Sequence, residues 1–458
     1  MVTHVLMRSN HTIPVINRKE PLILGLGDLI LMAFSLWAAL VLRYAELPSA
    51  NLVNAHILPF SIIFILSLVG FYITGLYGRG IHASRAGLPS LIIRGQIGNG
   101  ILAVVLLYFI PTFIVTPRIN LFIYLGLSTV FIILWRLNTY SLLSLRRKSP
   151  AFVIGSSVEA EELVREMSHN PRVGLYCRER LSPSESMQKL FSAMDEIHNE
   201  FIYVIADMDD PHMEAVLPEL YDRYFAKARI IDLHELYEEV FDRIPLSRMN
   251  HAWIMSTISS ITPGVYDFLK RAFDFLLGCI VGIACVIAYP FVALAIKLED
   301  RGPIFIVQER VGRNGEIIRI HKFRSMQRND SDKWVSESGT NNNQVTKVGT
   351  FIRSARIDEL PQALAVIRGD MSLIGPRADV IGLAKRLREE IPYYQVRTII
   401  SPGLTGWAQV SQDKPPQSVE ETKLRLSYDL YYITHRSFGL DIMIALKTLR
   451  TLLSRLGA

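Results

Sequence analysis

Residues 270–297 read KRAFDFLLGCIVGIACVIAYPFVALAIK, an apolar stretch long enough to cross a bilayer as a helix. The stretch has basic residues at both ends and Pro290 in its second half. A proline inside a helix removes one hydrogen bond, costs about 3 kcal/mol and usually bends or breaks the helix. A straight span would also place the many Lys and Arg residues after residue 297 outside the cell. We therefore expect a re-entrant helix over about 270–297 that bends near Pro290 and returns to the same face of the membrane.

Four further apolar stretches precede this segment and predict a four-helix transmembrane bundle over residues 1–148. Each is near the ~20 residues that a helix needs to cross a hydrocarbon core of ~30 Å. They lie at about 21–43, 56–77, 97–116 and 119–135. Basic residues precede the first stretch and follow the last, so the positive-inside tendency places both ends of the bundle in the cytoplasm. The alternative is that one or two of the four are buried core helices.

The composition fits a membrane protein with basic cytoplasmic loops. Half of the 458 residues are hydrophobic, and the net charge is +6. We expect no nucleic-acid partner, because the chain has no dense Lys/Arg tract interleaved with aromatic residues. Cys177, Cys279 and Cys285 form no CxxC pair, so neither a structural disulfide nor a zinc site is expected. The basic and apolar run at 442–453 predicts an amphipathic helix that lies against anionic lipid.

Mixed sequence after the bundle predicts a small α/β domain. Short apolar runs alternate there with helical stretches, at 151–154, 201–206 and 228–232. This alternation favours a parallel, Rossmann-like sheet, and we assign the domain to residues 149–265. The turn Gly155-Ser156-Ser157 lacks the second and third glycines of the GxGxxG fingerprint. A structural or regulatory role is therefore favoured over nucleotide binding, which stays open.

Asn314-Gly315 separates two β-rich runs at 304–308 and 316–323. Both residues accept the positive φ that a type I′ turn requires. The sequence therefore predicts a β-hairpin after the re-entrant segment.

The adjacent carboxylates Asp358 and Glu359 are the candidate catalytic residues. Neighbours on a helix point about 100° apart, so one carboxylate could attack while the other holds a metal or moves a proton. A carboxylate nucleophile suits phosphoryl transfer, because an acyl-phosphate intermediate splits one displacement into two. Arg353, Arg356 and Arg377 could neutralise phosphate oxygens, with Mg²⁺ completing the clamp. The alternative is a solvated helix face with ordinary pairs such as Arg356 with Glu359.

Several motifs flank the acidic pair in a fixed order. They are Lys270-Arg271-x-x-Asp274, Pro290, Gly302-Pro303, Gln308-Glu-Arg-Val-Gly312, Lys322-Phe-Arg-Ser-Met326, Asp358-Glu-Leu-Pro-Gln362, Gly369-Asp-Met-Ser-Leu-Ile-Gly-Pro-Arg377 and Pro402-Gly-Leu-Thr-Gly-Trp-Ala-Gln409. Over residues 266–458 this order resembles the bacterial sugar transferase family, the polyprenyl-phosphate phosphoglycosyl transferases that begin exopolysaccharide, capsule and O-antigen synthesis. The four spans and the α/β domain look like the large form of that family.

The resemblance implies an activity and a role for each matching residue. The chain would transfer a sugar-1-phosphate from a UDP-sugar to undecaprenyl phosphate and release UMP. Asp358 would be the nucleophile that becomes a phospho-sugar aspartate, and Glu359 would be its partner. Both carboxylates would hold Mg²⁺. Five basic residues would bind phosphate, and the first two would form the floor of the site: Lys322, Arg324, Arg353, Arg356 and Arg377.

The chain departs from the family's pattern at two places. Pro290 would be the breaking proline of the re-entrant helix, but Tyr289 stands where the family commonly has serine. Ala378 follows Arg377 where the family often has a second proline. We expect this to loosen the turn but to leave the phosphate-binding role of Arg377 intact.

The expected fold is a membrane α-helical bundle, a small α/β domain and an α/β-mixed catalytic domain over 266–458 with the re-entrant helix. The expected location is the bacterial cytoplasmic (inner) membrane, with the catalytic domain on the cytosolic face. A homodimer stays open, and no motif identifies the sugar. One alternative is a membrane-bound nucleotide-sugar dehydratase or epimerase, which would need an intact GxGxxG and a YxxxK motif, here only Tyr266 to Lys270. The other is a non-catalytic membrane scaffold, which would need no acidic pair.

Overall fold

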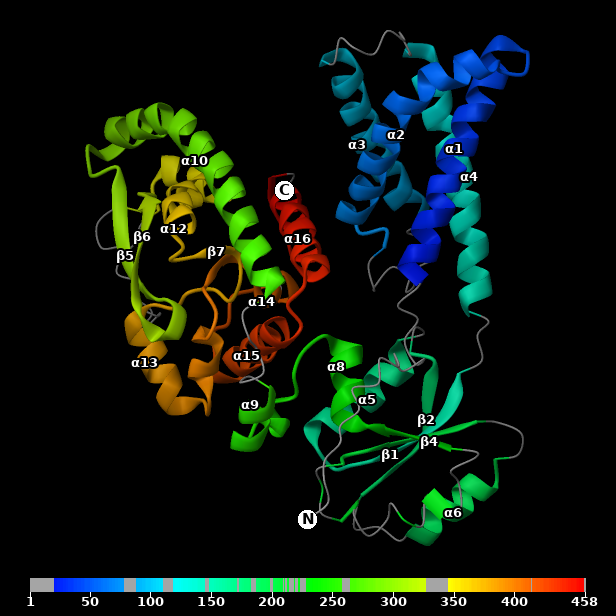
Figure 1. Cartoon of the computed structure of the whole chain (residues 1–458), viewed down its shortest axis with the longest axis vertical. Helices are drawn as coiled ribbons and strands as arrows, with labels where there is room; N and C mark the ends of the chain where they lie inside the picture. Colours follow the sequence, from blue (N-terminus) through cyan, green and yellow to red (C-terminus); the bar gives the residue numbers. More distant parts are fainter. Residues whose placement is uncertain are drawn as a thin grey trace. The chain divides into compact units, whose positions relative to one another are not determined.

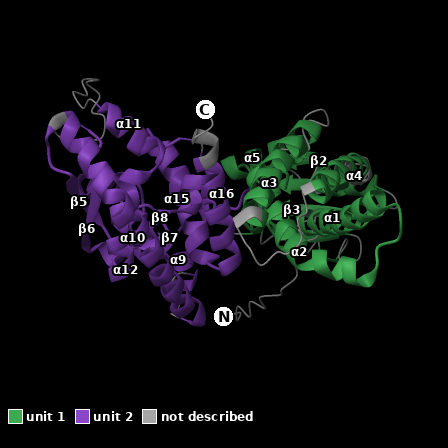
Figure 2. Ribbon diagram, turned by 90° about the horizontal axis from the view of Figure 1, so that it is seen from above, with its two compact units in different colours: residues 1–240 green, residues 241–458 purple. Residues whose placement is uncertain are grey.

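The computed structural model of the chain describes most of the sequence. The described residues are 20–77, 88–109, 118–144, 148–170, 173–182, 187–197, 201–208, 210, 212–213, 218, 221–222, 228–257, 264–326, 345–412 and 414–456. They belong to two compact units, residues 1–240 and residues 241–458 (Figure 2). Each unit has hydrophobic cores of its own.

Four long helices open unit 1 (Figure 1): α1 (Glu20–Tyr44), α2 (Ala50–Ile73), α3 (Leu88–Phe109) and α4 (Arg118–Ser144). Each contains an apolar stretch long enough to cross a membrane, which confirms the expected apolar helices. One fully buried side chain from each helix contributes to their common core: Met32, Phe60, Ile92 and Ile132. Other apolar side chains on every helix are exposed, as the lipid-facing surface of a membrane bundle requires.

The third helix starts earlier than the sequence predicts. It begins at Leu88 instead of near residue 97, and residues 110–116 of the expected span lie outside the described residues. Polar Gln96 lies in its first half, is buried, and donates from Nε2 to Ser128 Oγ of α4 at 2.8 Å. A polar side chain that is paired with a neighbouring helix is tolerated inside a membrane bundle, although it interrupts the apolar pattern.

An ion pair lies inside the bundle. Arg136 of α4 donates to both carboxylate oxygens of Asp28 in α1, and both side chains are buried. The Tyr77 hydroxyl donates to Asp28 Oδ2 at 2.7 Å. Because an unpaired charge in hydrocarbon is costly, this pairing favours one arrangement of α1 against α4.

A four-stranded parallel sheet follows in unit 1 and confirms the predicted α/β region. Its strands are β1 (Ser149–Ile154), β2 (Leu175–Leu181), β3 (Ile202–Ala206) and β4 (Ala228–Asp232), in the order β2-β1-β3-β4. Its helices are α5 (Val158–His169), α6 (Met187–Asp195) and α8 (Leu233–Phe241). Figure 1 shows α5 and α8 on one side of the sheet and α6 on the other. Ser157 caps α5 by accepting the Ala160 N–H at 3.2 Å, so the turn after β1 starts a helix without a glycine-rich loop.

Unit 2 mixes short helices with two small sheets around one long helix. Its elements are η3 (Leu246–Arg248), α9 (His251–Thr257), α10 (Val265–Asp300), β5 (Phe305–Val311), η4 (Arg313–Gly315), β6 (Ile317–Phe323), α11 (Lys347–Ser354), η5 (Ile357–Gln362), α12 (Ala363–Arg368), β7 (Ser372–Ile374), α13 (Ile381–Glu390), η6 (Tyr394–Thr398), β8 (Gly403–Thr405), α14 (Trp407–Ser411), α15 (Val419–Thr434) and α16 (Phe438–Leu456). The predicted hairpin is confirmed, because β5 and β6 pair antiparallel. Asn314 and Gly315 both have positive φ, 53° and 84°, as the turn prediction requires.

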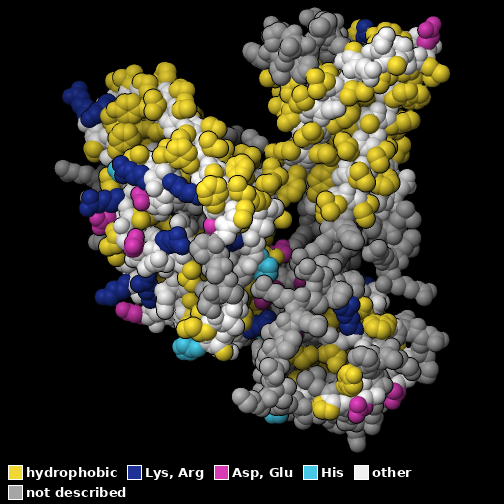
Figure 3. Space-filling view, viewed as in Figure 1, with side chains coloured by type: hydrophobic (Ala, Val, Ile, Leu, Met, Phe, Trp, Pro, Cys, Tyr) yellow, Lys and Arg dark blue, Asp and Glu magenta, His cyan; other side chains and the backbone are white. Residues whose placement is uncertain are grey.

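The long helix α10 is attached to the rest of unit 2 at both ends. Near its start, Arg271 donates to the carbonyl oxygens of Val366 and Ile367, at 2.6 Å each. At its end, the Glu299 carboxylate accepts the N–H of Lys347 at 2.7 Å and so caps α11. Between these ends many apolar side chains of α10 are exposed, and Figure 3 shows hydrophobic side chains gathered over this helix. Pro290 lies inside it, and in Figure 1 the ribbon changes direction in its second half.

Candidate active site

The acidic pair lies on η5, a short 3-10 turn between α11 and α12. Arg356 starts this turn in the left-handed conformation, with φ 56°, which ends α11. Pro361 has no N–H to continue an α-helical pattern through the turn. The sequence predicted an ordinary helix here, and the 3-10 turn places adjacent side chains about 120° apart instead of 100°. Asp358 and Glu359 therefore face different surroundings.

Glu359 is held by two arginines. Its Oε1 lies 3.3 Å from Arg356 Nη1 and 3.7 Å from Arg377 Nη2. Burial raises the pKa of Glu359, but the charges of Arg377, Lys322 and Arg356 outweigh it and hold the pKa below its ordinary value. Glu359 is thus an anion fixed by cations at neutral pH. The pair of Arg356 with Glu359, expected as the plain alternative to a site, is present and helps to build it.

Asp358 has the opposite character. Burial and the neighbouring charge of Glu359 raise its pKa, against the attraction of Lys322, Arg353 and Arg356. Its Oδ1 is buried and has no hydrogen-bond partner among the described residues. A buried acceptor without a partner costs about 1–3 kcal/mol, so such atoms in a native structure call for a functional explanation. Asp358 therefore has the basicity and the unused lone pairs of a nucleophile.

Four of the five predicted cations contribute to the charge around the pair: Lys322 at the end of β6, Arg353 in the last turn of α11, Arg356, and Arg377 after β7. The fifth, Arg324, lies just beyond β6, and its Nε donates to Met326 O at 3.0 Å. Its guanidinium lies against Gly302, where an added Cβ would come within 1.4 Å of Nη1. Arg324 therefore helps to pack the segment after α10, and its predicted role as part of the phosphate floor stays a prediction.

The acidic pair also fits a magnesium ion by its chemistry. No group of three or more His, Cys, Asp or Glu side chains that could hold a metal occurs in the part of the chain that the structure describes. Mg²⁺ needs no such cage, because it usually takes one or two carboxylates together with substrate phosphate oxygens and water. Asp358 Oδ1, which has no partner in the described part of the chain, and the ionised Glu359 are suitable donors of this kind.

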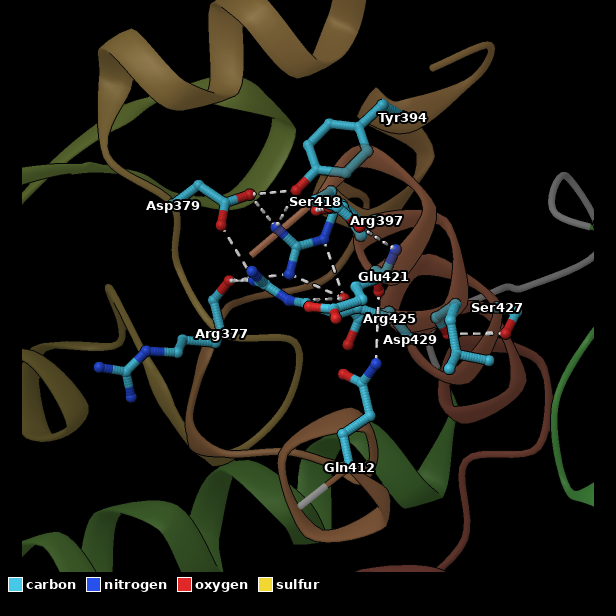
Figure 4. Close-up of polar contacts among 12 residues, drawn as sticks. Arg377, Asp379, Tyr394, Arg397, Gln412, Ser418, Glu421, Arg425, Ser427 and Asp429 are labelled. Carbon is cyan, nitrogen blue, oxygen red and sulfur yellow. Dashed lines mark hydrogen bonds and ion pairs between the residues drawn. The ribbon is translucent and has the colours of Figure 1, made fainter. Parts of the chain in front are cut away.

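A second group, of four charged residues and one tyrosine, contacts the backbone of Arg377. The sequence analysis did not predict it. We call it the Arg397 cluster (Figure 4), and its members are Asp379, Tyr394, Arg397, Arg425 and Asp429. Arg397 donates to both aspartates, and Arg425 lies 2.9 Å from Asp379 Oδ1. Burial raises the pKa of Asp379, but Arg397 and Arg425 outweigh it and hold the pKa far below its ordinary value. The members come from loops and helices far apart in the sequence, so no local motif indicates them.

The tyrosine and lysine that a dehydratase would need are used elsewhere. Tyr266 OH donates to Asp441 Oδ2 at 2.8 Å, and Lys270 Nζ lies 3.2 Å from the same oxygen. Both therefore attach the start of α10 to α16. This contact argues against the dehydratase or epimerase alternative.

The fold and the site together define a membrane protein in which two unequal carboxylates lie among cations suited to phosphate. Residues 265–455 match the family model described as bacterial sugar transferase. The chain is also 36% identical over 192 residues to the exopolysaccharide production protein PSS of Rhizobium leguminosarum bv. phaseoli, covering 41% of this chain and 96% of that protein. The chain belongs to the bacterial sugar transferase family.

Two larger relatives match over more of the chain. One is the UDP-N-acetylgalactosamine-undecaprenyl-phosphate N-acetylgalactosaminephosphotransferase of Aeromonas hydrophila, 34% identical over 268 residues, which are 56% of this chain and 60% of that protein. Another is the UDP-glucose:undecaprenyl-phosphate glucose-1-phosphate transferase of Escherichia coli (strain K12), 33% identical over 255 residues, which are 55% of this chain and 54% of that protein. The match thus spans little more than half the length of these relatives.

Proposed function

We propose that this chain transfers a sugar-1-phosphate from a UDP-sugar to undecaprenyl phosphate and releases UMP. The single observation that carries the proposal is the asymmetry of the acidic pair. Asp358 has a raised pKa and an oxygen without a partner among the described residues, whereas two arginines hold Glu359. The names of the two larger relatives support the same substrates, and they name different sugars. The sugar used by this chain is therefore left open.

The proposed reaction has two displacements at one phosphorus. First, an oxygen of Asp358 attacks the phosphorus that carries the sugar, the bond to the bridging oxygen breaks, and UMP leaves with that oxygen. Second, an oxygen of undecaprenyl phosphate attacks the same phosphorus, the bond to Asp358 breaks, and the carboxylate is restored. No proton is gained or lost between substrates and products. Lys322, Arg356 and Arg377 neutralise charge on the phosphate oxygens, which is the main task of a protein in such chemistry.

Glu359 and a metal ion complete the charge balance in this proposal. Because its pKa is lowered, Glu359 suits the role of a metal ligand and an anchor for Arg356 and Arg377 better than that of a proton carrier. When bound, Mg²⁺ would supply further positive charge beside the diphosphate. Asp358 and Glu359 would hold it.

We also propose that α10 is re-entrant and that the site lies on the cytosolic face of the bacterial cytoplasmic membrane. A straight helix of 36 residues would be about 54 Å long, far more than the bilayer core requires. Yet its second turn and its last turn both contact the rest of unit 2, through Arg271 and Glu299. If α10 crossed the bilayer, the parts of unit 2 that its two ends contact would lie on opposite sides of the membrane, although they belong to one compact unit. Its exposed apolar middle then enters the lipid and returns.

The reaction is tested with detergent-purified full-length protein, undecaprenyl phosphate, Mg²⁺ and a panel of UDP-sugars. We expect UMP release with at least one sugar, loss of release in Asp358→Ala, and normal release in Glu389→Ala, a control at an exposed position of α13. When the acceptor is omitted, the mass of the peptide containing Asp358 should increase by that of a sugar phosphate less one water. Absence of UMP with every sugar, or full activity of Asp358→Ala, would refute the proposal.

The topology is tested by cysteine labelling in whole cells. The three native cysteines are first replaced, and a cysteine is introduced at the exposed Arg319 position of β6. We expect it to react only with a membrane-permeant reagent. Reaction with an impermeant reagent added from outside would show that α10 spans the membrane.

A further inference from the structure

The backbone of Arg377 is held by two other arginines. Its carbonyl oxygen accepts from Arg397 Nη2 at 2.9 Å and from Arg425 Nη2 at 3.0 Å. In Figure 4 the Arg377 side chain points away from these two residues. That side chain is about one-third exposed and reaches Glu359. One residue therefore belongs to two groups, with its main chain in the Arg397 cluster and its guanidinium at the acidic pair.

The charged side chains of the Arg397 cluster make several hydrogen bonds to one another. Arg397 donates through Nε and Nη2 to Asp429 Oδ2, at 2.9 and 2.7 Å, and through Nη1 to Asp379. Asp379 also accepts from Arg425 at 2.9 Å and from the Tyr394 hydroxyl at 2.7 Å. The two positive and two negative charges balance, and all four charged side chains are at most 11% exposed. Such a network keeps its geometry because each change would leave a buried charge without its partner.

The turn that carries Arg377 is attached on its other side to β8. Gly375 donates its N–H to Thr405 O at 2.9 Å, and Gly403 donates to Pro376 O at 2.9 Å. The carbonyl of Arg377 is then the next backbone acceptor along the turn, and the two guanidiniums hold it. Ala378, the residue that follows, does not restrict its own φ as a proline would. The orientation of Arg377 is therefore set by these contacts from outside the turn.

We propose that Arg397 and Arg425 are positioning residues, which act on the reaction only by directing the Arg377 guanidinium toward the acidic pair and the phosphate bound there. This inference rests on the proposed function. Neither residue needs to touch substrate. Their effect passes through one carbonyl oxygen, and a displacement of that backbone by about 1 Å is enough to reduce turnover about 100-fold.

The test uses a double-mutant cycle in the full-length protein. Arg425→Lys keeps a positive charge near Asp379, but the lysine side chain is shorter than that of arginine. Its ammonium does not extend to the position of Nη2, the nitrogen that donates both to Asp379 and to Arg377 O. The matched control is Arg436→Lys, because Arg436 is similarly buried, at 13% against 11% exposed, and pairs with Asp267 at 2.7 Å, away from the turn. The measured quantities are kcat and the KM for the UDP-sugar, from UMP release.

We expect Arg425→Lys to lower kcat/KM about tenfold through the same parameter, kcat or KM, that Arg377→Ala changes. In the Arg377→Ala background, Arg425→Lys should change kcat/KM less than about twofold, since the residue through which it acts is gone. Arg436→Lys should stay within about twofold of the unchanged protein in both backgrounds.

Two results would overturn the inference: a full tenfold loss from Arg425→Lys in the Arg377→Ala background, or no loss in the unchanged background. If Arg425→Lys does not fold, Tyr394→Phe replaces it in the cycle, because that change removes only the hydroxyl that donates to Asp379. We expect Tyr394→Phe to lower kcat/KM about threefold in the unchanged background and to have little effect in the Arg377→Ala background. If the unchanged protein releases no UMP, the proposed function fails; if it does and the cycle is additive, only the positioning role fails.

Discussion

Unit 2 contains two groups of arginines and carboxylates that differ in how completely their charges are paired. In the Arg397 cluster both aspartates are buried and hydrogen-bonded to guanidiniums, and the pKa of Asp379 is far below its ordinary value. In the acidic pair Asp358 keeps an oxygen without a partner among the described residues, and its pKa is raised. The same residue types therefore serve two purposes. Complete pairing compensates the charges of the Arg397 cluster, whereas incomplete pairing leaves Asp358 Oδ1 without a partner among the described residues, as the proposed attack requires.

This comparison separates stability from activity. A group whose pKa is raised on folding is destabilising in its ionised form, and one whose pKa is lowered is stabilising. Asp358 thus lowers the free energy of unfolding at neutral pH, whereas Asp379 increases it. Destabilising charges of this kind are common at functional sites. Five substitutions or conditions test this difference, beginning with the largest expected effect.

Asp358→Asn should abolish UMP release while leaving the protein at least as stable as before. The amide cannot attack phosphorus, and we expect a loss of at least about 1,000-fold. It also removes the charge that burial destabilises, so the midpoint of thermal unfolding should stay unchanged or rise. A clear fall in that midpoint would show that Asp358 is a structural residue like Asp379. Glu389→Gln, at an exposed position, is the control for both measurements.

Asp379→Asn should have the opposite profile, with a large loss of stability. It leaves Arg397 and Arg425 buried with one anion fewer, and breaking a buried pair in this way costs about 3–5 kcal/mol. Denaturant unfolding of the purified protein measures this cost. An unfolding free energy within about 0.5 kcal/mol of the original, the usual effect of a surface substitution, would show that the charge pairs of the Arg397 cluster do not stabilise the fold.

The two groups also differ in how far the sequence predicts them. Asp358 and Glu359 are adjacent and lie among arginines, so one short segment indicates the candidate site, and its catalytic role stays a prediction. The Arg397 cluster joins residues from 379 to 429 that form no motif, and only the tertiary fold brings their charges together. Sequence spacing also predicted a plain helix at the acidic pair, because nothing local shows that Arg356 adopts a left-handed conformation.

Predictions of the fold succeeded where the pattern was local and apolar. The four N-terminal helices, the parallel sheet and the β5–β6 hairpin all follow from hydrophobic runs and turn residues. The start of α3 was missed because Gln96 interrupts the apolar pattern and is buried by a hydrogen bond that only the packed bundle supplies. Pro290 lies inside α10, as the sequence shows, whereas the re-entrant course of the helix stays a proposal that rests on the contacts near both of its ends.

The pH dependence of activity should expose the influence of Glu359 on Asp358. Protonated Asp358 cannot attack, so kcat/KM should fall as the pH is lowered through its raised pKa, at a higher pH than an ordinary aspartate near 3.9 would give. Glu359→Gln removes a negative charge that raises this pKa. We therefore expect the acidic limb of the residual activity to move to lower pH, and a limb that stays in place would show that Glu359 does not act on Asp358.

Asp379 and Asp358 should affect the stability of the protein at acid pH in opposite directions. Because the pKa of Asp379 is lowered, its contribution to stability is present above the unfolded value of about 3.9 and is lost as the pH falls toward the folded value. Because the pKa of Asp358 is raised, its contribution has the opposite sign, and protonation above pH 3.9 relieves a cost. As the pH is lowered toward about 3.9, protonation of Asp358 should add to the free energy of unfolding of the unchanged protein. The Asp358→Asn variant should lack this gain when its free energy of unfolding is measured over the same pH range.

The smallest effect should come from Arg353, the exposed cation beside Asp358. Its charge acts through water, where salt screens it and a single charge is worth little. Arg353→Gln should raise the KM for the UDP-sugar by about threefold at low ionic strength, and the difference should vanish as salt is added. Arg368→Gln, exposed in the last turn of α12 as Arg353 is in that of α11, is the matched control. A rise in KM that persists in salt would mean that Arg353 binds phosphate directly. Arg353 would then be a further charged residue of the acidic site that is left incompletely paired until substrate binds.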